Sequence, residues 1–199
     1  MGSKISVALA GNPNSGKTTI FNHLTGTRQH VGNYPGVTVE RKEGICRHGD
    51  AEVQVVDLPG TYSLTAYSAD EVVARNFVVD GQPDVVVDII DASNLERNLY
   101  LAVQIMELGV PLVLAFNMSD TARARGQEFD LEKLSRFLGA PIVETVGHKK
   151  EGIAELLDAV VRVARDGHRE AAERIDYGAE YWARMDALGT SQRYAIDIS

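Results

Sequence analysis

One short stretch near the N-terminus has the residue types and spacing to hold a phosphate group. Gly11 and Gly16 are separated by four residues, and Lys17 and Thr18 follow directly. This is the phosphate-binding loop pattern, in which glycines let successive N–H groups turn into one concavity. Lys17 would reach the β- and γ-phosphates, and the Thr18 hydroxyl would coordinate Mg²⁺. The residues of this segment expected to contact a nucleotide are Gly11, Asn12, Pro13, Asn14, Ser15, Gly16, Lys17, Thr18 and Thr19.

The flanking residues are expected to supply the strand and the helix that such a loop requires. Residues 5–10 form a short apolar run, typical of a buried strand in a parallel sheet. Residues 19–24 read as a helix, whose positive dipole end would face a bound pyrophosphate. The alternative is a glycine-rich turn that precedes a lysine by chance, and it requires neither element.

A second motif follows the predicted strand at residues 51–57. Asp57 ends this strand and Gly60 follows after Leu-Pro, so the Asp57 carboxylate is placed to hold Mg²⁺, through water, at a strand end. The Gly60 N–H can turn to a γ-phosphate and would then sense hydrolysis. The alternative is an ordinary Asp-x-Pro-Gly turn.

A third motif distinguishes guanine from adenine. The Asp120 carboxylate can accept hydrogen bonds from guanine N1–H and the exocyclic amine, a donor pair that adenine does not offer. Asn117 would tie this segment to the phosphate loop. Met118 stands where a lysine is usual, and its stem can still cover the base. The later segment Thr145, Val146 and Gly147 would read guanine O6 through a backbone N–H.

Thr38 is the candidate for a second Mg²⁺-binding hydroxyl. It follows residues 26–36, which are rich in Gly, Asn, His and Pro and predict a mobile loop. Such a loop would deliver Thr38 only when a γ-phosphate is present. The competing interpretation is that Thr38 merely begins a strand over residues 37–47.

The order of elements predicts an α/β fold in which a mostly parallel, six- or seven-stranded sheet carries helices on both faces. Residues 37–47 and 51–57 should pair as a hairpin. Further strands are expected at 85–91, 111–116 and 140–144, and helices at 69–80, 95–106, 129–138 and 153–164. In such sheets ligands bind beyond the carboxyl ends of the strands, where each motif lies. We expect one domain over residues 1–166 and a short helical appendage over 167–199.

Composition restricts the class of protein. The chain has 199 residues, 44% of them hydrophobic, and a formal net charge of −8, which argues against a general nucleic-acid surface. The single cysteine, Cys46, cannot form an internal disulfide, so we expect a reducing setting. No segment approaches the ~20 apolar residues of a membrane span, so we expect a soluble chain. His30, His48, Cys46 and Trp182 are interpreted as ordinary structural residues rather than iron ligands.

Several segments together resemble the N-terminal G domain of the ferrous iron transport protein B (FeoB) family of bacterial membrane proteins. These segments are residues 11–18, 31–40, 57–64, 91–101 and 117–120. The resemblance implies a Ras-like P-loop GTPase fold that binds GTP, GDP and Mg²⁺ at the cytoplasmic face of the inner membrane. It also implies a helical regulatory domain, cut short here after Leu188, and a membrane iron-permease domain absent from this chain. It further allows contact between copies of the chain through the switch regions, the segments that contain Thr38 and Gly60.

The family resemblance also implies how hydrolysis is assisted. Asn14 resembles the position that potassium-activated GTPases use to hold K⁺ near the phosphates, with backbone carbonyls around Gly32 and Tyr34 completing the shell. Asn14 could instead only shape the loop. Thr61 replaces the water-positioning glutamine of Ras-like enzymes, so turnover should be slow. The residues assigned to catalysis are Asn14, Lys17, Thr38 and Gly60.

The function expected from all of this is a GTP-hydrolysing switch domain that regulates ferrous iron uptake. One alternative is a ribosome-assembly or tRNA-modification GTPase, against which the acidic charge balance counts. A second alternative is a module that holds a nucleotide with little turnover, which the absence of the glutamine leaves open.

Overall fold

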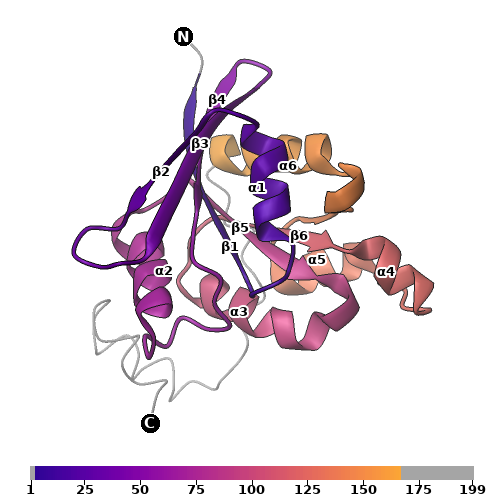
Figure 1. The fold of residues 1–199 in the computed structure, drawn as a ribbon. Helices are drawn as coiled ribbons and strands as arrows, with labels where there is room; N and C mark the ends of the chain where they lie inside the picture. The colour runs from indigo at the N-terminus through magenta and orange to yellow at the C-terminus, as the bar shows by residue number, and fades with distance from the viewer. Residues whose placement is uncertain (1–2, 167–199) are drawn as a thin grey trace.

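Short apolar runs that alternate with amphipathic segments fold into a seven-stranded sheet between two layers of helices (Figure 1). The structure is a computed structural model, and it describes residues 3–166. The predicted α/β class and the mostly parallel sheet are confirmed. The predicted helical appendage at residues 167–199 lies outside the described residues, so the proposed domain boundary stays a prediction.

The predicted elements follow one another in the expected order, and a strand at residues 29–33 and a helix at 119–124 are present in addition. The strands are β1 Lys4–Gly11, β2 Gln29–Asn33, β3 Glu40–His48, β4 Ala51–Asp57, β5 Val85–Asp91, β6 Leu112–Asn117 and β7 Ile142–Glu144. The helices are α1 Lys17–Thr25, α2 Ala69–Asp80, α3 Leu95–Glu107, α4 Ser119–Ala124, α5 Leu131–Leu138 and α6 Ile153–Asp166. Two 3₁₀ turns, η1 Ala92–Asn94 and η2 Gly147–Lys149, connect them.

The strand order and register bring the motif-bearing loops to one edge of the sheet. The order is β2-β3-β4-β1-β5-β6-β7, with β2–β3 and β3–β4 antiparallel and the remaining pairs parallel. Leu9 of β1 pairs with Asp57 of β4, and Asp91 of β5 pairs with Asn117 of β6. The phosphate loop, the Asp57 turn and the Asn117 segment therefore leave the sheet at the same edge, because parallel strands end together.

Apolar side chains on the two faces of the sheet form two cores. On one face α1 and α6 cover the sheet, and Phe21 and Leu156 are almost fully buried there. On the other face Leu101 and Ile105 of α3 pack with α2 against the strands. Burying each such side chain stabilises the fold by roughly 1.5–3 kcal/mol. The sheet is held between the helices and provides a fixed base for the loops (Figure 1).

The first turns of two helices are capped by short polar side chains. The Ser68 hydroxyl accepts a hydrogen bond from the Glu71 N–H, and the Glu71 carboxylate accepts one from the Ser68 N–H, which fixes the start of α2. Asp130 caps α5 in a similar way, since its carboxylate accepts a hydrogen bond from the Lys133 N–H.

The segment expected to be a mobile loop, residues 26–36, contains the edge strand β2 in its centre. β2 pairs with β3 from Gln29 opposite Gly44 to Asn33 opposite Glu40. Its side chains are exposed or half-buried on both faces, so its sequence has no alternation of apolar and polar residues that could reveal a strand. The expected strand start at residue 37 is also wrong, because β3 begins at Glu40.

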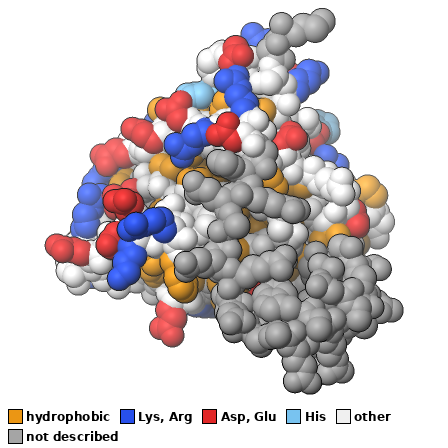
Figure 2. Space-filling model, turned by 180° about the vertical axis from the view of Figure 1, so that it is seen from behind, with side chains coloured by type: hydrophobic (Ala, Val, Ile, Leu, Met, Phe, Trp, Pro, Cys, Tyr) orange, Lys and Arg blue, Asp and Glu red, His pale blue; other side chains and the backbone are white. Residues whose placement is uncertain are grey.

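The surface carries mixed charge. Among the described residues on the face shown in Figure 2, Lys and Arg side chains alternate with Asp and Glu and do not gather into one basic area. Within residues 3–166, no helix is both long and apolar enough to cross a membrane.

One polar side chain interrupts the core beneath the phosphate loop. Asp88 of β5 is 1% exposed, lies between Ala10 and Leu114 in the sheet, and its Oδ2 has no hydrogen-bond partner. Burial raises the pKa of Asp88 to about 7, because the charged carboxylate is poorly solvated there. The folded state therefore binds this proton more tightly than the unfolded chain does.

We expect the stability of the domain to fall as the pH rises from about 4 to about 7, the interval between the ordinary aspartate pKa of 3.8 and the raised value. Asp88→Asn should remove this slope and raise the free energy of unfolding at pH 8 by on the order of 2–4 kcal/mol. Urea unfolding at several pH values measures both effects. Replacement of the exposed Asp80 by Asn is the control, and an unchanged slope in Asp88→Asn would contradict the assignment.

Candidate functional site: a nucleotide-binding edge

The loop between β1 and α1 forms a concavity of free N–H groups. Gly16 adopts the left-handed conformation with φ 88°, which turns the chain into the first helical turn. The N–H groups of Gly16, Lys17, Thr18 and Thr19 donate to no carbonyl or side chain within the described residues. Four adjacent unpaired N–H groups at a helix N-terminus form an anion site that suits phosphate.

Lys17 is buried against the Asp57 turn. Its ammonium donates hydrogen bonds to the Asp57 carboxylate and to the Leu58 carbonyl, and both charged side chains are about nine-tenths buried. A buried cation requires such a partner, because desolvation is costly. The two predicted residues, Asp57 from β4 and Lys17 from α1, thus lie together. Each balances the other's charge, as Mg²⁺ and a phosphate would in a nucleotide complex.

The rest of the phosphate loop contains polar atoms that the fold leaves unpaired. Asn12 Oδ1 and Ser15 Oγ are buried without a hydrogen-bond partner. The Asn14 side chain is exposed, and its φ of 67° is one that asparagine tolerates. The Thr18 side chain is also exposed at the start of α1. These side chains present oxygen atoms around the loop.

Asn117 joins three segments of this edge. Its Nδ2 donates to the Ser15 carbonyl at 2.8 Å, and its Oδ1 accepts from the Gly147 N–H at 2.9 Å and from Thr145 Oγ1 at 3.3 Å. The amide is buried, so each of these bonds is shielded from water. The tie between the Asn117 segment and the phosphate loop is the one expected from the sequence.

The predicted base-reading residues lie beside this tie. Asp120 is partly exposed, and Met118 places its terminal methyl group near Gly16. The Val146 N–H donates to the Glu151 carbonyl, so in this structure neither it nor the Gly147 N–H is free. Reading guanine O6 would require one of these bonds to open.

The sequence did not predict three side chains of the base edge, which comprises residues 117–120 and 145–149 together with the part of α1 that contacts them. Lys149 Nζ lies 3.1 Å from Asp120 Oδ2, and His148 Nε2 lies 3.5 Å from the same oxygen. The Lys149 hydrogen bond is the main cause that lowers the pKa of Asp120. His23 of α1 bonds the Gly147 carbonyl through Nε2 at 2.7 Å. The position of Lys149, two residues after the predicted segment 145–147, could have indicated its role. Nothing in the sequence pointed to His23.

Within the described residues, Thr38, Gly32 and Tyr34 form no hydrogen bond with the phosphate loop. Thr38 lies in an exposed turn, and Gly32 lies within β2. The Tyr34 ring is buried against Phe77 of α2, edge to face with centroids 6.3 Å apart, and Arg41 lies over it at 5.8 Å. Burial raises the pKa of Tyr34 to about 12.

Gly60 lies directly against the phosphate loop. A side chain built at Gly60 would place its first carbon 3.4 Å from the Cα of Pro13. The next residue fixes this approach, since the Thr61 N–H donates to the Gly11 carbonyl at 3.3 Å. The Asp57 turn is therefore fastened to the phosphate loop at both of its ends.

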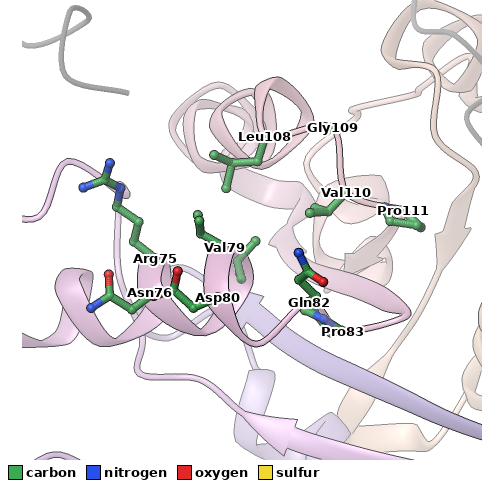
Figure 3. Close-up of a pocket in the computed structure, with 11 residues that line it drawn as sticks. Arg75, Asn76, Val79, Asp80, Gln82, Pro83, Leu108, Gly109, Val110 and Pro111 are labelled. Atoms are coloured by element: carbon green, nitrogen blue, oxygen red, sulfur yellow. The ribbon is translucent and has the colours of Figure 1, made fainter. Parts of the chain in front are cut away.

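A hollow of about 610 Å³ lies at the opposite edge of the sheet, between the ends of α2 and α3 (Figure 3). Pro83 and Pro111, which lie within two residues of the starts of β5 and β6, line it together with Leu108. Its position at the amino ends of these parallel strands separates it from the nucleotide motifs at their carboxyl ends.

Comparison with known proteins decides the family. The family model described as ferrous iron transport protein B matches residues 5–160. The chain belongs to the ferrous iron transport protein B family. The chain is 45% identical to the Fe(2+) transporter FeoB of Escherichia coli K12 and 50% identical to that of Salmonella typhimurium, over 93% and 98% of its length. It spans about a quarter of these relatives, 24% and 25%.

Solved FeoB structures share the fold. The cytosolic domain of the T. maritima FeoB iron transporter in a GDP form superimposes with a TM-score of 0.88 at 39% identity, over 96% of this chain and 75% of that one. The FeoB G domain of Methanococcus jannaschii gives a TM-score of 0.74 at 46% identity, over 82% of this chain and 99% of that one. The chain therefore corresponds to the family's N-terminal G domain.

The oxygen donors at the phosphate edge fit Mg²⁺. The Thr18 hydroxyl and the Asp57 carboxylate are the protein groups available at the start of α1 and the end of β4. Mg²⁺ usually takes one or two protein oxygens and completes its shell with water and phosphate. Within residues 3–166, no cluster of three or more His, Cys, Asp or Glu residues suited to a metal occurs.

Gly16→Ala should uncouple the phosphate loop from the base edge. A Cβ at Gly16 would lie 2.2 Å from Asn117 Nδ2, so the amide must move away from Ser15. We expect guanine nucleotide affinity to fall at least ~10-fold, since one buried hydrogen bond is worth about 1–2 kcal/mol. Calorimetric titration with GDP measures the affinity.

Gly109→Ala is the matched control for Gly16→Ala. Gly109 also has a positive φ, 68°, but a Cβ there meets no atom within 4 Å. Both variants bear a backbone strain of roughly 1–2 kcal/mol, and only Gly16→Ala adds the clash. Equal GDP affinities in the two variants would show that the Gly16–Asn117 contact is unimportant.

Proposed function

We propose that this domain binds and hydrolyses GTP and acts as a switch that regulates ferrous iron uptake by a membrane transporter of its family. The observation that carries the proposal is the Asn117 side chain, which bonds the phosphate loop and the base-edge loop at once. A phosphate nest and a guanine-reading carboxylate are thereby held at a fixed separation. The GDP form of the T. maritima relative supports a guanine nucleotide as the ligand.

The chain's own groups would act on the phosphates in a defined order. The unpaired N–H groups of residues 16–19 would donate hydrogen bonds to the phosphate oxygens, and Lys17 would leave Asp57 to reach the β- and γ-phosphates. The Asp57 carboxylate would then be free to accept hydrogen bonds from water molecules bound to Mg²⁺. Mg²⁺ held by the Thr18 hydroxyl and, through water, by Asp57 would neutralise the negative charge that develops on the phosphates. Water attacks the γ-phosphate in line with the leaving oxygen.

The switch itself would be carried by two segments. Gly60 lies against Pro13, so its N–H needs only a small shift to meet a γ-phosphate. Thr38 must travel further, and Tyr34 must leave its contact with Phe77 for that movement to occur. The released segments could then contact the permease domain or a second copy at the cytoplasmic face of the membrane.

Thr61 offers no catalytic substitute for a glutamine. Its hydroxyl donates to the Ser63 carbonyl at 2.6 Å, accepts from the Ser63 N–H at 3.2 Å, and is buried. A buried hydroxyl whose single proton is already donated within its own turn is a poor group for orienting an attacking water. This favours slow turnover assisted by K⁺ at Asn14, whose exposed side chain can offer its oxygen to a cation.

The alternatives receive less support. A ribosome-assembly or tRNA-modification GTPase requires a basic surface, whereas charges of both signs alternate on the face shown in Figure 2. A module that binds nucleotide without turnover would show no dependence of phosphate release on Mg²⁺ or K⁺.

Base choice gives the first test. The wild-type chain should bind GTP at least ~10-fold more tightly than ATP, because only guanine offers two donors to Asp120. Asp120→Asn should weaken GTP binding and improve binding of xanthosine triphosphate, whose acceptor pattern suits the amide. Competition against a fluorescent nucleotide measures both. Equal wild-type affinities for ATP and GTP would disprove the guanine assignment.

Cation dependence gives the second test. We expect phosphate release from GTP to be at least ~10-fold faster in K⁺ than in Na⁺, equivalent to ~1.4 kcal/mol of barrier. Asn14→Ala should remove this difference and leave GDP affinity within a few fold. The K⁺ mechanism is wrong if turnover is the same in both salts or if Asn14→Ala keeps the difference.

A further inference from the structure

The guanine-reading carboxylate is already occupied by the protein itself. Asp120 Oδ1 accepts the Thr121 N–H at 2.9 Å, and Oδ2 faces Lys149 at 3.1 Å and His148 at 3.5 Å. Guanine requires both oxygens at once, one for N1–H and one for the exocyclic amine. The Thr121 N–H can stay, because a carboxylate oxygen accepts more than one hydrogen bond. The lysine lies on the oxygen that the base must share.

The position of Lys149 is set by the loop that carries it. The Lys149 N–H donates to the Val146 carbonyl at 2.9 Å, and the Gly147 carbonyl is bonded by His23 at 2.7 Å. The Gly147 N–H is held by Asn117. This 3₁₀ turn is therefore anchored to α1 and to β6, and it directs a lysine toward Asp120. The Asn-x-x-Asp segment itself carries no cation, because Met118 stands where a lysine is usual. Lys149 places a cation beside Asp120 from a different loop.

We propose that Lys149 competes with guanine for Asp120 and so weakens the retention of nucleotide. The proposal rests on the function proposed above. In the empty state the ion pair satisfies the carboxylate, so a guanine base gains its two hydrogen bonds only by replacing an existing partner. A competing state in the free protein multiplies the apparent affinity by the fraction of molecules that remain binding-competent. A lysine placed to cover the base would have the opposite effect.

The size of the effect follows from the exposure of the pair. The Lys149 side chain is 48% exposed and that of Asp120 is 25% exposed, so solvent screens the attraction. Pairs of this kind shift an equilibrium by roughly two- to fivefold. This is enough to change how long GDP is retained without abolishing its binding.

The test measures the dissociation constant of GDP for variants of the whole 199-residue chain. Lys149→Met keeps the apolar stem and removes the charge, and it should tighten GDP two- to fivefold. Lys149→Arg keeps the charge and should retain the wild-type affinity. Lys150→Met is the matched control: it loses the same charge one residue later, where the structure shows no ion pair with Asp120, and it should not tighten GDP.

A second background separates competition for Asp120 from a general change in the loop. In Asp120→Asn, assayed with xanthosine diphosphate, the ion pair is gone, so adding Lys149→Met should have no further effect. The inference is overturned if Lys149→Met weakens GDP, leaves it unchanged, or tightens nucleotide equally in the Asp120→Asn background. A wild-type chain that binds no GDP overturns the proposed function and this inference together.

Discussion

The buried amide of Asn117 is the interaction on which the rest of the nucleotide edge depends. Its hydrogen bonds join Ser15, which lies 102 residues before Asn117 in the chain, to Thr145 and Gly147, which lie 28 and 30 residues after it. Since the three partners are backbone or short side-chain groups, they leave little freedom for the loops to shift. Gly16 is required for the same reason, because its neighbour Asn117 Nδ2 fills the space that a Cβ would need. The Asn117 side chain alone therefore fixes the distance between the phosphate-binding N–H groups and the base edge.

Charged groups of this edge are paired with one another. Lys17 bonds Asp57, and Lys149 faces Asp120. In each pair a protein cation holds a carboxylate that would otherwise meet the metal side of the site or the base. The Lys17 and Asp57 charges are also desolvated, and desolvated charges are stable only with partners, so a site that binds a highly charged ligand must provide internal substitutes. Ligand binding then exchanges partners rather than creating new ion pairs, which limits the net affinity gained from so many charges.

The sequence predicted the buried elements well and the exposed ones poorly, for physical reasons. Residues 85–91 and 69–80 were predicted with the bounds that β5 and α2 have, because a continuous apolar run and an amphipathic pattern leave clear signals. β2 was missed because an edge strand exposed on both faces needs no apolar alternation. Asn117 could be placed from its motif, whereas the Lys149 contact depends on how a 3₁₀ turn is oriented, and spacing alone does not determine that.

The position of Tyr34 shows how the expected movement of Thr38 is opposed. The Tyr34 ring contributes to the apolar core beside α2, but its hydroxyl is buried without a hydrogen-bond partner. Burial of the ring stabilises this arrangement by roughly 1.5–3 kcal/mol, and the unpaired hydroxyl offsets about 1–3 kcal/mol of that gain. The two contributions are of similar size, so the Tyr34 ring itself adds little net stability to this position of the segment. Interactions of Thr38 with a bound γ-phosphate and metal would need to supply only a small difference to draw the segment away from α2.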